Sequence, residues 1–222
     1  FGDDATGEKA VAYIKACQDF HARGIPLVAD HVGGLPGLGA LAFGAVGGIA
    51  HGVTVNQSFK ASSWRRPPQE GSGGGGVRVY LPQLDMLIKR STVKEFLTSS
   101  QRVRGRHVCK DTHCCGRGVI DMLDRPARHA LYQRAREIEK LSTQPESVRV
   151  PTYLDTVRRV SDEVALAASF EKIDPELREK LQCKQKKLGH YRDAIAHMAS
   201  TKMTPSTAIS PVRRSARKQA SK

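Results

Sequence analysis

Aromatic residues and acidic residues are both scarce in this sequence. Phe, Trp and Tyr make up 5% of the 222 residues, and apolar residues of all kinds make up 39%. Asp and Glu number 22 against 36 Lys and Arg, so the formal net charge is +14. This excess of positive charge favours a polyanionic partner, with nucleic acid as the first candidate and an anionic membrane surface as the second. A soluble core that carries a basic tail is the simpler alternative.

Signals for secretion and for membrane insertion are also missing. Asp3, Asp4 and Glu8 stand where a secretory signal would be basic and then apolar. The long uncharged stretch at 32–50 is rich in glycine and interrupted by Pro36, which favours a packed α/β core over a membrane span. Five cysteines, an odd number and partly clustered, do not fit a secreted disulfide framework. We therefore expect a cytoplasmic protein without a membrane partner.

Composition divides the chain into four parts. Residues 1–58 are apolar and rich in glycine, and residues 59–76 have the Gly and Pro content of a flexible linker. Residues 77–200 are polar and mostly helical in pattern, with a cysteine-rich loop among them. Residues 201–222 form a basic tail whose composition is that of a disordered segment.

The first part repeats a helix and a strand. Residues 8–24 have the spacing of an amphipathic helix, and residues 25–31 are a continuous apolar run typical of a buried strand. Residues 35–46 and 47–55 repeat this order, which is typical of parallel α/β proteins. We interpret the part as the C-terminal portion of a (β/α) barrel, completed by an upstream segment or a partner chain. Further helices, forming a basic extension, are expected at 81–100, 125–142, 152–170 and 175–199.

Polar residues and glycines follow the two predicted strands. Reacting groups lie at the carboxyl ends of the strands in (β/α) barrels, and backbone N–H groups in the following loops often hold phosphate. The candidate catalytic residues are Asp30, His31 and His51, and the candidate ligand-binding residues are Gly33, Gly34 and Gly52. The alternative is that Asp30 caps the next helix and that the histidines bond to local backbone.

Three of the five cysteines fall within seven positions of the stretch HVCKDTHCCGRGVIDML, residues 107–123. Zinc prefers four thiolate or imidazole ligands in a tetrahedron. The candidate ligands are Cys109, His113, Cys114, Cys115 and, from the following helix, His129. Because adjacent cysteines seldom bind one ion, one of them is expected to be spare. Buried thiols without metal are one alternative, and a reactive thiolate stabilised by neighbouring Arg and Lys is another.

Basic residues also gather near this stretch and in the linker. Spread over several elements, such residues can contact phosphates without reading sequence. The candidate nucleic-acid contacts are Trp64, Arg65, Arg66, Arg102, Arg104 and Arg106.

The order of these parts resembles the tRNA-guanine transglycosylase family and its relatives in DNA modification. The resemblance covers about residues 9–168: two strands (IPLVADHVGG and GGIAHGVTV), a zinc segment (CKDTHCC) and closing helices. It implies a (β/α) barrel, a structural zinc and tRNA or DNA as partner. The family has a C-x-C-x2-C run and a nucleophilic Asp near the position of His51 and Gly52, and this chain has neither. Base exchange through a covalent nucleotide therefore does not carry over.

The predicted function is association with nucleic acid, with nucleobase modification of the transglycosylase type as its activity. One alternative is a non-catalytic protein that binds or scaffolds nucleic acid. The other is an enzyme that acts on a small phosphorylated substrate.

Overall fold

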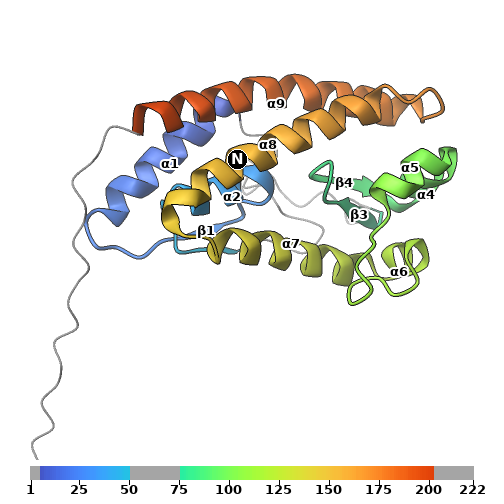
Figure 1. Cartoon of the computed structure of the whole chain (residues 1–222), viewed down its shortest axis with the longest axis horizontal. Helices are drawn as coiled ribbons and strands as arrows, with labels where there is room; N and C mark the ends of the chain where they lie inside the picture. Colours follow the sequence, from blue (N-terminus) through green and yellow to red (C-terminus); the bar gives the residue numbers. More distant parts are fainter. Residues whose placement is uncertain (1–5, 51–75, 203–222) are drawn as a thin grey trace, which may run out of the picture.

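The structure is a computed structural model that describes residues 6–50 and 76–202. Most of these residues are helical, and the strands are short (Figure 1). The elements in chain order are α1 (Gly7–His21), β1 (Val28–Asp30), α2 (Gly34–Ala42), β2 (Gly48–Ala50), β3 (Arg78–Leu81), β4 (Met86–Lys89), α4 (Arg90–Ser99), α5 (Gln101–His107), α6 (Val119–Asp124), α7 (Pro126–Ser142), α8 (Glu146–Ala168) and α9 (Pro175–Lys202).

The expected order of helix, strand, helix and strand in the first part is present, but the strands are shorter than predicted and are not fully buried: Val28 of β1 is 64% exposed. Residues 51–55 of the second expected strand lie outside the described residues. Strands β1 and β2 pair in parallel, with Ala29 opposite Ile49. Helix α2 connects them, and all nine of its residues are buried. Gly39 lets this helix pack closely, because a Cβ atom there would lie 2.7 Å from the Tyr153 hydroxyl. The described residues hold two sheets of two strands each and do not include a closed barrel.

The prediction of a helix over residues 81–100 is wrong for the first half of that range. Strands β3 and β4 form an antiparallel hairpin here, with Tyr80 opposite Leu87, and helix α4 begins only at Arg90. Leu84, Leu87 and Ile88 have spacings that fit one face of a helix, but two strands joined by a short turn bury the same types of residue. Pro82 and a left-handed Asp85, with φ of 46°, make that turn.

The helices expected at 125–142, 152–170 and 175–199 are present as α7, α8 and α9. Helix α8 begins at Glu146, earlier than predicted, and contains Pro151 in its second turn. Helices α8 and α9 lie side by side along the molecule, and α7 runs below α8 (Figure 1). Within the part of the chain that the structure describes, we find no helix with the length and apolar content of a membrane span.

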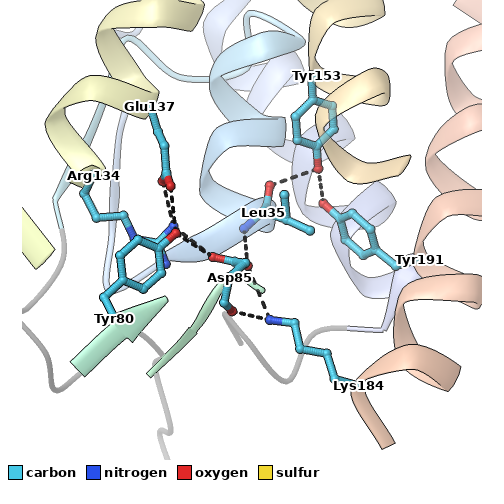
Figure 2. A network of polar contacts seen from close by, with 8 residues as sticks. All are labelled: Leu35, Tyr80, Asp85, Arg134, Glu137, Tyr153, Lys184 and Tyr191. Carbon is cyan, nitrogen blue, oxygen red and sulfur yellow. Dashed lines mark hydrogen bonds and ion pairs between the residues drawn. The ribbon is translucent and has the colours of Figure 1, made fainter. Parts of the chain in front are cut away.

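A buried carboxylate joins the hairpin to three helices (Figure 2). Asp85 accepts a hydrogen bond of 3.2 Å from the Leu35 amide near the start of α2. Arg134 of α7 lies 2.9 Å from its Oδ1, and Lys184 of α9 lies 3.5 Å from its Oδ2. Burial alone would raise the pKa of Asp85, but Lys184, Arg134 and the amide outweigh it and hold the pKa below its ordinary value. The carboxylate is therefore charged in the folded protein.

Tyr80 lies beside this carboxylate and shares its partners. The Arg134 guanidinium stacks 4.1 Å from the centre of the Tyr80 ring. The Tyr80 hydroxyl donates to Glu137 at 2.8 Å and lies 3.3 Å from Asp85. Glu137 also accepts from Arg134 at 2.9 Å. Hairpin and α7 are thus joined by a connected set of charged and polar groups rather than by apolar packing alone.

We expect Asp85→Asn to lower the free energy of unfolding by about 3 kcal/mol, because it leaves partly buried Lys184 without its counter-charge and buried Arg134 with Glu137 as its remaining acidic partner. Asparagine keeps the size of the side chain and tolerates the left-handed backbone of this position. Urea denaturation measures the loss. Asp124→Asn is the matched control, since Asp124 is exposed and its ion pair with Arg90 should contribute less than about 1 kcal/mol. Equal losses in the two variants would contradict a structural role for the buried carboxylate.

Candidate metal centre

The three clustered cysteines lie in the loop between α5 and α6. The Asp111 side chain orders this loop, because its carboxylate accepts hydrogen bonds from the backbone N–H groups of His113 at 2.9 Å and Cys114 at 3.2 Å. Its backbone carbonyl accepts the Cys115 N–H at 2.8 Å. Gly118, with φ of 58°, then turns the chain into α6. These hydrogen bonds within the loop hold its backbone so that the side chains of Cys114 and Cys115 are directed inward.

Cys109, Cys114, Cys115 and His129 bring four possible ligand atoms within 4.8 Å of one another. The sulfur atoms of Cys114 and Cys115 are 3.7 Å apart, and each lies 3.3 Å from Nδ1 of His129. A tetrahedral ion with bonds of ~2.3 Å to sulfur requires sulfur atoms roughly 3.8 Å apart. The four side chains have the chemistry and spacing of a site that could hold one metal ion.

His129 is oriented for metal binding by its second nitrogen. It lies in the first turn of α7, which begins at Pro126, and its Nε2 is 3.0 Å from the backbone carbonyl of Tyr80. A carbonyl only accepts hydrogen bonds, so Nε2 carries the proton and Nδ1 directs a lone pair at the sulfur atoms. Burial lowers the pKa of His129, which keeps the ring neutral. Such a bond from the distal nitrogen is typical of metal-binding histidines.

The surroundings of the thiols give no support to a reactive cysteine. Burial raises the pKa of Cys109 and of Cys115, so without metal these groups remain thiols. Two of the basic residues expected to stabilise a thiolate have other partners: Arg106 pairs with Glu163 at 2.7 Å and Arg117 with Asp121 at 2.7 Å. Cys114 and Cys115 are buried and Cys109 is partly buried, which suits metal ligands better than a reactive thiol.

Two details of the expected ligand set change. His113 is exposed and lies outside the group of four. The loop uses its backbone N–H, and its ring does not join the cluster. Cys114 and Cys115, of which one was expected to be spare, both belong to the group.

The predicted strand-end residues lie elsewhere. Asp30 ends β1 and His31 follows it, with their side chains 3.8 Å apart; Asp30 is exposed, His31 is partly exposed, and His31 has a left-handed backbone with φ of 55°. Gly33 and Gly34 are buried. Asp85 already binds the amide of Leu35 at the start of α2. His51 and Gly52 lie outside the described residues. In Figure 1, β1 and the cysteine loop are at opposite ends of α7, so they do not form one site.

The predicted nucleic-acid contacts divide in the same way. Arg102 and Arg104 are exposed on α5, whereas both oxygens of Glu163 bind Arg106. Trp64, Arg65 and Arg66 lie outside the described residues.

Supporting residues of the centre were not found from the sequence. Gln133 donates to the Cys109 sulfur at 3.4 Å from the turn of α7 that follows His129. Tyr132 and Arg136 approach Asp111 from the same helix. The spacing of His129, Gln133 and Arg136 along one side of a helix was the available signal, but only the fold shows that this side meets the loop.

Comparison with models of protein families, with curated proteins and with solved structures gave no match to this chain. The site is therefore interpreted from its own residues.

We expect His129→Ala to abolish binding of one equivalent of metal, because it removes a ligand and the bond to Tyr80. Elemental analysis of the purified protein measures metal per chain. His113→Ala is the matched control in the same loop and should retain the metal. Retention by both variants, or loss in both, would contradict the assignment of the four ligands.

Proposed function

We propose that this protein binds nucleic acid through the basic end of the molecule formed by α5, the cysteine loop and the start of α7. The observation that carries the proposal is the charge of this end. Arg102, Arg104, Lys110, Arg125 and Arg128 are all exposed there. The acidic residues nearby are already paired: Asp111 with Arg136, Asp121 with Arg117 and Asp124 with Arg90. Arg128 also donates to the His113 carbonyl at 3.0 Å and Arg102 lies over the Phe170 ring, but these neighbours are uncharged, so the positive charge can contact phosphates.

We propose zinc as the metal, with a structural role. Three cysteine sulfurs and one imidazole suit a closed tetrahedral zinc site, which leaves no position for substrate. Cys109 follows α5 closely and His129 belongs to α7, so an ion held by both would fix these two basic elements relative to one another. The metal would thus stabilise the surface that contacts phosphate.

Nucleobase modification is the more specific form of this proposal. The support is the pair of Asp30 and His31 at the carboxyl end of β1, where enzymes with parallel strands place reacting groups. The strained backbone of His31 is of the kind found at functional sites. In this proposal Asp30 would accept a proton or orient His31, and the strands that complete a (β/α) barrel would supply the rest of the site. A non-catalytic nucleic-acid-binding protein is the alternative.

The other alternative, an enzyme for a small phosphorylated substrate, gains no support from the described residues. It requires accessible backbone N–H groups at Gly33 and Gly34. Both glycines are buried, and a carboxylate already occupies the start of α2.

We expect binding to tRNA to weaken as salt rises, with the double variant Arg102→Ala and Arg104→Ala binding about tenfold more weakly and with a smaller salt slope. Fluorescence anisotropy with labelled tRNA measures both quantities. Arg192→Ala is the control: Arg192 is an exposed arginine on α9, 3.3 Å from Asp193. Binding that does not change with salt, or an equal loss in the control, would count against the basic end.

We expect Asp30→Asn to keep tRNA binding and to lose any modification of the RNA, because it removes the base and leaves the basic end intact. Mass spectrometry of nucleosides from tRNA incubated with each protein measures the product. If the unmodified protein binds tRNA but yields no altered nucleoside, the non-catalytic alternative is favoured.

A further inference from the structure

The four ligand groups of the candidate metal centre are not held equally well. Cys114 and Cys115 are buried, and hydrogen bonds within their loop order the backbone that carries them. A backbone carbonyl orients the ring of His129. Cys109 lies in the connection that follows α5 and is only partly buried, and its thiol is 3.9 Å from the backbone carbonyl of Asp111. Among the four groups, Cys109 is the one that its own backbone supports least.

One side chain of α7 supports this thiol instead. Nε2 of Gln133 lies 3.4 Å from the Cys109 sulfur. Gln133 stands four residues after His129, so the two side chains lie on the same side of the helix. A thiolate only accepts hydrogen bonds, and the carboxamide therefore has to direct an N–H group at it. Such a bond fixes the direction of the sulfur and withdraws charge from it, as partners of metal ligands commonly do.

A cleft between α7 and α8 reaches the same side of the centre. Its volume is about 1050 Å³. Its walls include Gln133 and Asp111, both of which contact the cysteine loop, and the exposed carboxylate of Glu139. A metal site requires a path by which the ion can enter. The cleft supplies a path on the side of Gln133 and of the least buried cysteine.

We propose that metal is exchanged through the cleft between α7 and α8, with Cys109 as the ligand that opens and closes the centre and Gln133 as the positioning residue that controls this step. When Cys109 opens, water from the cleft takes its place on the ion, and the other three ligands retain their bonds. The N–H group of Gln133 returns the sulfur to its position. The inference rests on the zinc of the proposed function and is independent of nucleic acid.

The test uses the whole protein loaded with one equivalent of zinc and follows transfer of the metal to an excess of a chromogenic chelator. Gln133→Glu keeps the size of the side chain but directs an acceptor at the sulfur, so zinc release should be at least about tenfold faster. Gln133→Leu removes the donor and should also accelerate release. Gln185→Glu, at an exposed position of α9, is the control and should release zinc at the unchanged rate.

A second readout separates the hydrogen bond from mere filling of space. With cobalt in place of zinc, both Gln133 variants should move the sulfur-to-metal charge-transfer band to longer wavelength, because the sulfur no longer shares charge with a donor. If Gln133→Glu releases zinc at the unchanged rate and leaves the band in place, Gln133 only fills space and the inference is overturned.

The route is tested by the rate of zinc binding at low salt. Glu139→Lys places a positive charge in the cleft and should slow binding by about threefold, because the incoming cation has to pass it. Asp19→Lys makes the same change of charge at an exposed position of α1, outside the walls of the cleft, and should bind zinc at the unchanged rate. Equal slowing in the two variants would overturn the cleft as the route.

The outcomes also distinguish this inference from the proposed function. If the unchanged protein binds no metal, both the structural zinc and the exchange route are overturned. If it binds one equivalent of zinc and the Gln133 variants exchange it at the unchanged rate, only the role of Gln133 and Cys109 in exchange is overturned.

Discussion

The Asp85 carboxylate is the interaction on which the arrangement of the helices depends. The hairpin delivers it to a point where α2, α7 and α9 meet, and each helix contributes one donor: the Leu35 amide, Arg134 and Lys184. A buried charge is costly unless several such donors compensate it, so the helices must approach together for the carboxylate to be stable there. Apolar packing brings the helices together, but this group specifies which ends meet.

Tyr80 connects this carboxylate to the candidate metal centre. Its hydroxyl contacts Asp85 and Glu137, whereas its backbone carbonyl accepts a hydrogen bond from Nε2–H of His129. An ion that holds Nδ1 of His129 fixes the proton on Nε2, because a ring nitrogen bound to metal cannot carry one. The hydrogen bond from Nε2–H of His129 in α7 to the Tyr80 carbonyl in β3 would then be kept. Metal binding would stabilise the hairpin that carries Asp85 as well as the loop itself.

The sequence was sufficient for features that depend on close neighbours. Cys109, Cys114 and Cys115 could be recognised from spacing, and His129 from its place one helix turn into α7. The hairpin was missed because Leu84, Leu87 and Ile88 suit either a helix or two strands, and only the turn at Asp85 distinguishes them. The role of Asp85 was not predictable, because its partners are distant in the sequence. Leu35 lies 50 residues before it, Arg134 about as far after it, and Lys184 of α9 lies 99 residues after it. No local pattern encodes such distant pairing.

The proposed nucleic-acid surface and the strand end at Asp30 and His31 are separate. The basic end and β1 lie near opposite ends of α7 (Figure 1). The Asp85 group joins α2, α7 and α9 through Leu35, Arg134 and Lys184. Phosphate contacts position a nucleic acid without reading its sequence. In the proposed function, selectivity would then have to come from other residues, and the strand end at Asp30 and His31 is the candidate.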